Sequence, residues 1–332
     1  MLATVRHDFY HLPEYVELCA RQEGGTATAF YAETPDNALL IPLLARDIPV
    51  VAGEWKDLSS PYGYPSPLLR NPADGDGLHR FMEEFRWLAA HQGYVSLFLR
   101  LHPLLPLPTA PLRDFGELVI HGETVSIDLT QPEQLLWRQI RRDQRAGIRR
   151  LRERGFRVEM DDWSTLDEFM RIYSETMRRV GARGFYLFQK DYFTGLRSAL
   201  GDRLHICQVI SPHGHVAAGG LFSLTHGIMQ LHLSGTSDAY QKMGPSKLML
   251  YEICRWGQKA GARTLHLGGG VRGREDSLFG FKAAFSPLRN SFATFRMVVM
   301  EERYREIVRI WKKNRGHIGP DDDYFPPYRY IE

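Results

Sequence analysis

The sequence predicts an α+β fold of two similar domains, each with a mixed, mainly antiparallel sheet flanked by helices. Three observations carry this prediction. The 332 residues exceed the usual size of one domain. One succession of strands, helix and strand occurs twice, first short and then long. A proline-rich segment, residues 102–112, lies between the two occurrences. The predicted domains are therefore 1–115, completed by 301–332 packing back on it, and 116–300.

The elements of the first domain follow from the spacing of its apolar residues. A helix over 12–22 precedes two strands over 26–33 and 38–45 and a loop rich in proline, glycine and tyrosine. A helix over 78–91 and the strand "YVSLFLRL" complete the domain.

The second domain repeats this plan at greater length. After the strand "TVSIDL" we expect helices over 133–154, 165–179 and 190–199. The runs "RLHICQVIS", "HVAAGGLFSL" and "IMQLHLSGT" are joined by short turns, which favours an antiparallel meander. Gly219 and Gly220, inside the second run, indicate a bulge or the close approach of a ligand. A helix over 246–260, the strand "ARTLHLGG", the strand "NSFATFRMVVM" and a helix over 301–313 follow.

Composition excludes several classes of protein. The chain is 43% hydrophobic and 24% charged with a net charge of +3, which is ordinary for a globular protein. No signal peptide is evident, and no apolar run approaches the about 20 residues of a membrane helix, so we expect a cytoplasmic protein without integral membrane contact. Cys19, Cys207 and Cys254 are expected as buried thiols. The 13 histidines show no zinc-site spacing, and no nucleotide or hydrolase motif occurs, so neither a metal nor a bound cofactor is expected.

A helix start is the most distinctive local feature. The run "DAYQKMGPSKLML" places Gln-x-x-Gly-Pro-Ser between a strand and an amphipathic helix. Around Gln241, Gly244 and Ser246, free backbone N–H groups and the positive end of the helix dipole would meet at one spot, which favours phosphate or pyrophosphate. The alternative is a helix with a good start, Pro245, and no ligand.

Arginines dominate residues 138–157, with nine of them against two acidic residues. On one helix, five of them form a continuous basic stripe. These are Arg138, Arg141, Arg142, Arg145 and Arg149. Arginine suits bidentate contact with phosphate, so the stripe is a candidate surface for tRNA. The alternative is a solvated helix face that pairs with acidic residues elsewhere.

Five segments, in this order along the chain, resemble the Fem family of aminoacyl-tRNA-dependent aminoacyltransferases, which are built from two GNAT-like domains. They are "SPYGYPSPLL", "IRRDQRAGIRRLRERGF", "YSETMRRVGARGFYLFQKDYF", "YQKMGPSKLMLYEICRWGQKAGARTLHLGGG" and "SLFGFKAAFSP". The helix start also resembles the acyl-CoA pyrophosphate loop of GNAT-fold N-acyltransferases. Ser246 replaces the last small residue of that loop, and Pro245 removes an N–H group that those proteins offer.

The resemblance implies two GNAT-like domains and a transfer site at Phe281 and Lys282. A fixed ammonium there would stabilise negative charge on the ester carbonyl oxygen or on the leaving ribose oxygen. A surface lysine beside a buried phenylalanine is the structural alternative.

Four further residues are candidates for binding the acceptor. The resemblance implies that Arg179 and Arg183 hold acceptor phosphates, and without such phosphates both would be structural. Tyr62 and Tyr64, in a rigid proline- and glycine-rich loop, can offer hydroxyl groups to a substrate, unless the loop is simply packed under the sheet.

The predicted function is an aminoacyl-tRNA-dependent aminoacyltransferase that forms an amide on a small amine metabolite or a peptidoglycan precursor. No nucleophile motif is present, so the acceptor amine is expected to attack directly, without a covalent intermediate. Aminoacyl-tRNA is then a co-substrate. One alternative is an acyl-CoA-dependent N-acyltransferase of the GNAT fold. The other is a catalytically silent protein that binds peptide or RNA.

Overall fold

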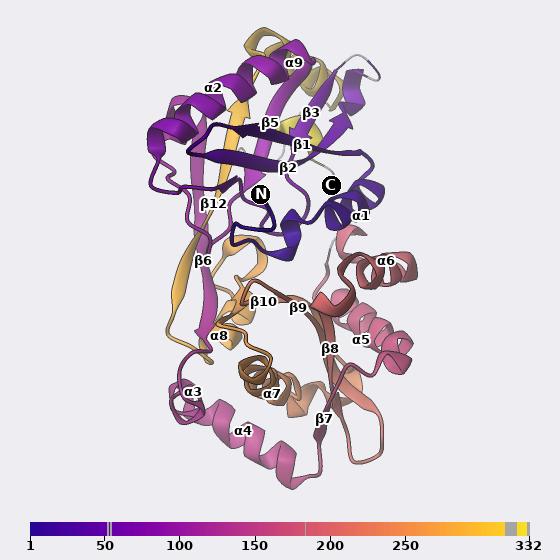
Figure 1. Cartoon of the computed structure of the whole chain (residues 1–332). Coiled ribbons are helices and arrows are strands. Elements are labelled where there is room, and N and C mark those ends of the chain that lie inside the picture. The colour runs from indigo at the N-terminus through magenta and orange to yellow at the C-terminus, as the bar shows by residue number, and fades with distance from the viewer. Residues whose placement is uncertain (52, 54, 183, 316–323, 331–332) are drawn as a thin grey trace. The chain divides into compact units, whose positions relative to one another are not determined.

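The computed structural model describes residues 1–51, 53, 55–182, 184–315 and 324–330, which form a mixed α/β structure (Figure 1). The chain divides into unit 1, Met1–His121 with Ser291–Glu332, and unit 2, Gly122–Asn290. The sequence placed these boundaries near 115 and 300. They fall instead within two long strands, β6 (Glu117–Asp128) and β12 (Arg289–Val298), which run from one unit into the other. The predicted α+β class is confirmed.

The sheet of unit 1 has the strand order β1-β2-β3-β5-β12-β6. Its strands β1 (Thr26–Glu33) and β2 (Ala38–Asp47) form an antiparallel pair, whereas β3 (Lys56–Ser59) and β5 (Tyr94–Arg100) are parallel. Strand β4 (Leu68–Leu69) pairs with β2. Neither β3 nor β4 was predicted, because strands of four and two residues are too short to show an alternating pattern.

The described residues of unit 1 include three α-helices. Helix α1 (Pro13–Glu23) contacts β1 and β2. Helix α2 (Gly75–His91) begins where the Asp74 side chain accepts a hydrogen bond from the Gly77 N–H at 2.7 Å. Its apolar face joins the core of the sheet, and Ile307 and Trp311 of α9 (Glu301–Arg315) pack against β5. Unit 1 therefore has hydrophobic cores of its own.

The sheet of unit 2 has the order β6-β11-β10-β9-β8-β7. The predicted meander is confirmed, because β8 (Leu204–Ile210), β9 (Val216–Thr225) and β10 (Ile228–Thr236) pair antiparallel in turn. Strand β7 (Arg157–Met160), which is short, was not predicted.

Parallel pairing at the centre of unit 2 is brief. Strand β11 (Thr264–Gly268) pairs with β10 only as far as Gln230, although β10 continues to Thr236. Both strands then become irregular, between Leu231 and Leu233 in β10 and between His266 and Gly268 in β11. The carboxyl ends of the two parallel strands are thus not joined to each other. Such ends are where ligands commonly bind in α/β proteins.

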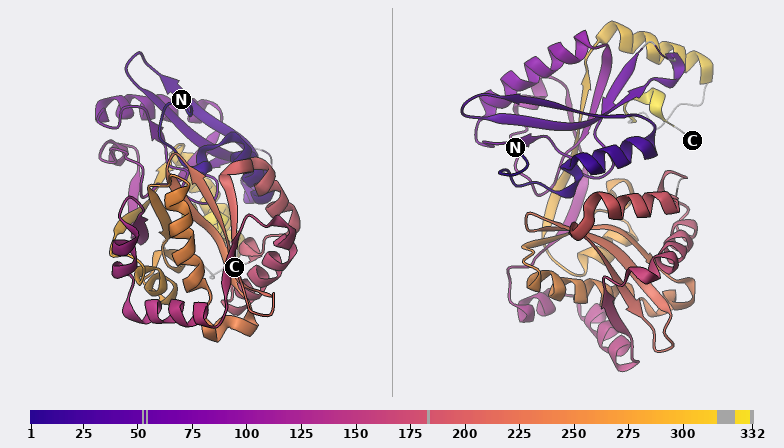
Figure 2. Two further views of the ribbon diagram at one scale, coloured as in Figure 1. Left: turned by 60° about the horizontal axis from the view of Figure 1, so that its bottom comes forward. Right: turned by 45° about the vertical axis from the view of Figure 1, so that its right-hand side comes forward.

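Helices cover both faces of this sheet (Figures 1 and 2). A Cβ added at Gly219 would lie 2.8 Å from Phe169 of α5 (Leu166–Arg179), whereas one at Gly220 would lie 3.2 Å from the Met249 Sδ of α7 (Ser246–Lys259). Gly219 pairs with Gly235 of β10, where a Cβ would lie 2.9 Å from the backbone of α5. The prediction of a bulge or a ligand at these glycines is therefore wrong. Gly219 and Gly235 allow α5 to approach the strands closely, whereas Gly220 faces Met249 of α7.

The arginine-rich segment is two helices rather than one (Figure 1). Helix α3 (Glu133–Gln139) ends before Ile140 and α4 (Arg142–Glu153) begins after Arg141, and both intervening residues are extended. Ile140 is buried, and the Arg141 N–H donates to the Ala284 carbonyl oxygen at 2.8 Å. The expectation of one continuous arginine stripe is thus wrong. No proline or glycine marks the break, because its cause is tertiary packing.

Two expectations from composition can be compared with the structure. Cys19, Cys207 and Cys254 are buried free thiols, as predicted. In the part of the chain that the structure describes, no helix has the length and apolar character needed to span a membrane.

Candidate functional site

Lys282 lies on the short helix α8 (Ser277–Ala283), which follows β11 and its glycines. Its Nζ donates a hydrogen bond to the Gly269 carbonyl oxygen at 2.7 Å. Burial lowers the pKa of Lys282 to about 8, while the nearby charge of Asp276 opposes this shift. Such a lysine is mostly protonated at pH 7 but releases its proton far more readily than an exposed lysine. Lys282 is thus an oriented, partly buried ammonium rather than a solvated surface group.

Asp276, which the sequence analysis missed, shapes the turn that carries Lys282. Its carboxylate accepts hydrogen bonds from the N–H groups of Val271 and Phe279, both at 2.9 Å. Burial alone would raise the pKa of Asp276, but these backbone hydrogen bonds and the charge of Lys282 lower it. A Cβ at Gly270 would lie 2.0 Å from the Arg274 carbonyl oxygen, so this turn requires glycine there. An aspartate before the helix is the sequence signal that could have indicated this role.

Phe281 has a structural place in the unit. Its side chain is partly buried against the main core of unit 2, and its ring centroid lies 5.5 Å from that of Phe285. It therefore fixes α8 on the core, next to Lys282.

The predicted donor loop is a tight turn. Residues Asp238–Met243 form the 3-10 helix η7, and Gly244 follows with φ +61°. The Gly244 N–H donates to the Gln241 carbonyl oxygen at 3.0 Å, and the Lys247 N–H donates to the Gly244 carbonyl oxygen at 3.3 Å. Pro245 has no N–H. In the residues that the structure describes, the Ser246 amide is thus the one N–H at this helix start without an acceptor.

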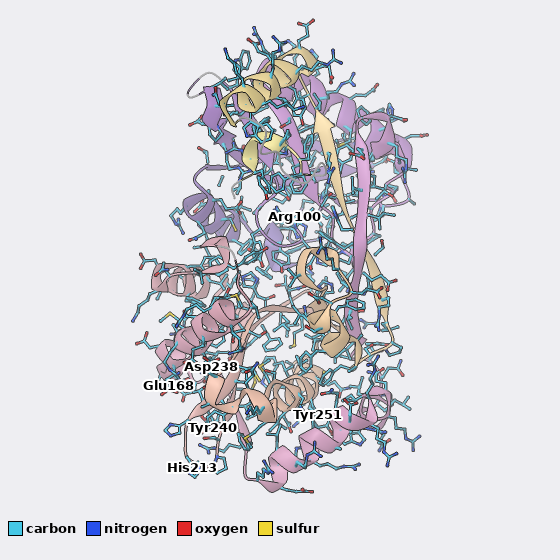
Figure 3. All side chains as sticks on the ribbon, turned by 180° about the vertical axis from the view of Figure 1, so that it is seen from behind. Arg100, Glu168, His213, Asp238, Tyr240 and Tyr251 are labelled. Atoms are coloured by element: carbon cyan, nitrogen blue, oxygen red, sulfur yellow. The ribbon has the colours of Figure 1, made fainter. Side chains whose placement is uncertain are left out.

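Ser246 and Gln241 differ in their surroundings. The Ser246 hydroxyl lies 2.6 Å from the Thr236 hydroxyl at the end of β10, so it joins the helix start to the central strand. Gln241 is exposed on η7, the element that also carries Asp238 and Tyr240, both labelled in Figure 3.

Lys247, at the second position of α7, connects the donor loop to the arginine-rich helix. A Cβ at Gly244 would lie 2.9 Å from its Cε, and one at Gly147 of α4 would lie 2.6 Å from its Cδ. Burial and the charge of Arg150 lower the pKa of Lys247, against the opposing effect of Asp143. No carboxylate of the described residues lies within 4.0 Å of its Nζ. No role was predicted for Lys247 from the sequence.

The five candidate arginines remain without carboxylate partners within 4.0 Å among the residues described. Four are exposed and Arg145 is partly buried. By contrast, Arg152 of α4 pairs with Glu252 of α7, and its guanidinium lies 4.9 Å from the ring centroid of Tyr251, which Figure 3 labels. Helix α4 is thus fastened to α7 by Arg152, while the other arginines keep an uncompensated positive charge.

Arg179 already has partners in unit 2. It forms an ion pair with Asp238 at the start of η7, and its Nη2 donates to the Thr176 hydroxyl and to the Thr236 carbonyl oxygen at 3.1 and 3.2 Å. It therefore ties α5 to the donor loop, and binding of an acceptor by Arg179 stays a prediction. Arg183, the second acceptor candidate, lies outside the described residues.

Tyr62 and Tyr64 belong to unit 1, whereas the other candidates belong to unit 2. The Tyr62 N–H donates to Glu23 Oε1 at 3.1 Å. The Tyr64 ring makes edge contacts with Tyr10 and Phe292, at centroid distances of 5.9 and 5.3 Å. Both tyrosines are partly buried, so the loop is a packed one. A role for their hydroxyls on an acceptor stays a prediction.

Among the described residues, no group of three or more histidine, cysteine, aspartate or glutamate side chains could hold a metal ion.

Comparisons with known proteins show what this chain is similar to. Residues 138–279 match the family model of an acetyltransferase (GNAT) domain, a span that includes the arginine-rich segment and the donor loop and ends three residues before Lys282. A search of curated proteins finds no match.

Several solved structures have a similar fold. FemX has a TM-score of 0.72 at 14% identity, over 91% of this chain and 95% of FemX. A conserved protein of unknown function from Bacteroides thetaiotaomicron has a TM-score of 0.59 at 12% identity, over 89% and 95%. L-PGS from Bacillus licheniformis has a TM-score of 0.54 at 18% identity, over 92% and 96%. The likeness to the Fem fold that the five sequence segments implied is thus confirmed.

Proposed function

We propose that this protein is a GNAT-fold acyltransferase whose donor is an aminoacyl-tRNA, because residues 138–279 match the family model of a GNAT acetyltransferase domain and the fold is similar to that of FemX. The acceptor is an amine, on a small metabolite or a peptidoglycan precursor, and the product is an amide. The observation that carries the proposal is the arginine-rich helix α4. It has unpaired cations, it packs against Lys247 of the helix that follows the donor loop, and the residue before it is hydrogen-bonded to the residue after the helix of Lys282.

Two contacts make this connection. The Arg141 N–H donates to the Ala284 carbonyl oxygen, directly after α8. At the middle of α4, Gly147 lacks a side chain, and Lys247 of the donor helix occupies the space beside it. A polyanion bound along the arginines would therefore lie beside the elements that carry Lys282 and Ser246. Binding of this kind is driven by charge and weakens as salt is added.

The donor loop itself favours tRNA over coenzyme A. Cradles for pyrophosphate offer several free backbone N–H groups. Here the Gly244 and Lys247 amides donate within the turn and Pro245 has none, so the amide of Ser246 is left. An acyl-CoA-dependent N-acyltransferase remains the second candidate, because the matching family model is that of an acetyltransferase domain.

Lys282 supplies the electrostatic part of the proposed reaction. The acceptor nitrogen attacks the ester carbonyl carbon of the aminoacyl group, the new C–N bond forms and the C–O bond to the ribose breaks. The amine loses a proton, and the ribose oxygen gains one. An ammonium held by Gly269 retains two further N–H groups, which can stabilise the negative oxygen that develops. No covalent enzyme intermediate is required.

A donor assay tests the proposal. The purified chain is given total tRNA charged with radiolabelled amino acids, or a panel of labelled acyl-CoAs, together with an extract of small amines. We expect label to enter a small product only from the tRNA, and RNase to abolish the transfer. Transfer only from an acyl-CoA, unaffected by RNase, would establish the second candidate instead. Absence of transfer from either donor, with equal ligand binding by the wild type and Lys282→Ala, would indicate a silent binding protein.

A further inference from the structure

A groove of about 520 Å³ lies on unit 2 between α5 and the residues leading into α6 (Lys190–Leu200). Both helices lie on the same side of the unit 2 sheet (Figures 1 and 2). Its volume falls in the range of small-molecule sites, about 300–1,000 Å³. The arginines of α4, the donor loop and Lys282 contribute nothing to its lining. The groove is therefore a feature that the proposed donor side does not use.

One positive charge in the groove is uncompensated. Three cations line it, but Lys190 pairs with Asp167 at 2.9 Å and Arg171 pairs with Glu175. The Arg178 guanidinium has neither an ion pair nor a hydrogen bond with any residue that the structure describes. The groove thus offers a guanidinium with all of its donors available, which suits a carboxylate or a phosphate.

Half of the other lining residues are apolar. Met170, Leu187 and Phe188 contribute hydrocarbon surface, and Leu187 is 39% exposed. Ser174 and Gln189 line the same groove as further polar residues. An apolar surface beside one unpaired cation fits an organic anion better than an inorganic one, because burial of the organic part adds to the ionic contact.

The apolar side of the groove is held in place by stacked aromatic rings. Phe188 stacks on Tyr192 with ring centroids 3.9 Å apart, and the Tyr192 hydroxyl lies 2.7 Å from Nε2 of His232. His232 belongs to β10, just beyond the residues that pair with β11. The surface is therefore ordered before a ligand arrives, which reduces the entropic cost of binding. It is also linked to the central strand of unit 2.

We propose that this groove binds an organic anion, with its carboxylate or phosphate on Arg178 and its apolar part on Met170 and Leu187. In an aminoacyltransferase this anion is the acceptor, an amine that also carries an acidic group. The assignment as acceptor rests on the proposed function, whereas the binding itself does not.

Binding is tested on the full chain with three probes of similar size: phenyl phosphate, phenylacetate and the neutral 2-phenylethanol, each titrated and followed by NMR. We expect at least one anion to bind about tenfold more tightly than the alcohol, and the tighter of the two identifies the acidic group. Arg178→Gln should lower the affinity for that anion about tenfold or more. Lys259→Gln, which removes an exposed cation at the end of α7, should leave its affinity unchanged. Equal affinities for wild type and Arg178→Gln, or no preference for an anion, would overturn the proposal.

The transfer assay separates the two levels of the proposal. If Arg178→Gln raises KM for the amine and leaves kcat unchanged, the groove holds the acceptor. If Arg178→Gln weakens binding of the anionic probe and leaves the transfer kinetics unchanged, the groove is an anion site but the acceptor assignment is wrong. If no transfer from tRNA occurs while the probe still binds through Arg178, the proposed function fails and the groove stands.

Discussion

Lys282 places an oriented positive charge at the proposed transfer site. Its ammonium is directed by the Gly269 carbonyl, and burial brings its pKa to about 8. If the protonated form is the active one, the rate should fall as pH rises through about 8, because the group loses its charge there. Lys282→Ala should lower kcat about 10²–10³-fold. Lys282→Arg should keep part of the rate and lose the alkaline decline, since arginine stays protonated. Rates of transfer between pH 6 and 10, corrected for uncatalysed ester hydrolysis, test this. A wild-type rate for Lys282→Ala would exclude the role.

Asp276 is a positioning residue whose effect should be visible in the same pH profile. Its charge raises the pKa of Lys282, so Asp276→Asn should move the alkaline decline to lower pH. The variant should also lose one of the two backbone hydrogen bonds that shape the turn and so lower kcat. The lowered pKa of Asp276 means that its own contribution to stability is present near neutral pH and is lost on acidification. Asp202→Asn, an exposed carboxylate on η6 (Gly201–Arg203), is a suitable control. An unmoved pH profile for Asp276→Asn would leave Asp276 as a purely structural cap.

At the scale of elements, α4 and the start of α7 form one basic surface. Replacing Arg142, Arg145 and Arg149 together by glutamine should weaken tRNA binding at low salt. It should also reduce the slope of log Kd against log salt concentration by about 2, since each phosphate contact with a single strand contributes about 0.7. The matched control replaces Arg303, Arg305 and Arg309 of α9, also three arginines of one helix. Equal effects of the two triple variants would mean that only net charge matters.

Lys247 provides a finer test of the same surface. Lys247→Met keeps most of the packing against Gly147 and removes the charge. We expect the slope of log Kd for tRNA against log salt concentration to decrease by the amount that one phosphate contact contributes, while thermal stability stays close to that of the wild type. A fall in stability without a change in salt dependence would show that Lys247 serves packing alone.

These same elements show what the sequence was able to predict. The helix over 246–260 was predictable because its apolar spacing, Pro245 and Gly261 all agree, and the structure has it as Ser246–Lys259. The break at Ile140 was not, since its cause is burial of that side chain and a hydrogen bond from Arg141 to a residue 143 positions away. The pairing of the donor-loop amides was hidden for a similar reason. Local signals mark where a loop lies, and only its backbone conformation decides which N–H groups remain free.

At the scale of the molecule, unit 1 is assembled from both ends of the chain. Its sheet contains β1 and β12, and its core includes α9 and Tyr328. The two similar α+β patterns in the sequence pointed to two domains. The pattern does not reveal that the unit boundaries fall inside two strands, because the alternation of residues along a strand does not change at such a boundary.

A buried ion pair joins these ends and gives the last prediction. Arg329 donates to both carboxylate oxygens of Asp57, at 2.9 and 2.8 Å, and the Asp57 side chain is 2% exposed. Arg329→Gln should lower the free energy of unfolding by about 3–5 kcal/mol, because it leaves a buried carboxylate with Arg46, at 3.9 Å, as its remaining cation. Arg305→Gln, which breaks an exposed pair with Glu301, should cost less than about 1 kcal/mol. Urea unfolding of both variants measures the difference. Asp57→Asn combined with Arg329→Gln should recover part of the loss, because no buried charge then lacks its partner. If Arg329→Gln costs no more than Arg305→Gln, residues 324–330 do not stabilise unit 1.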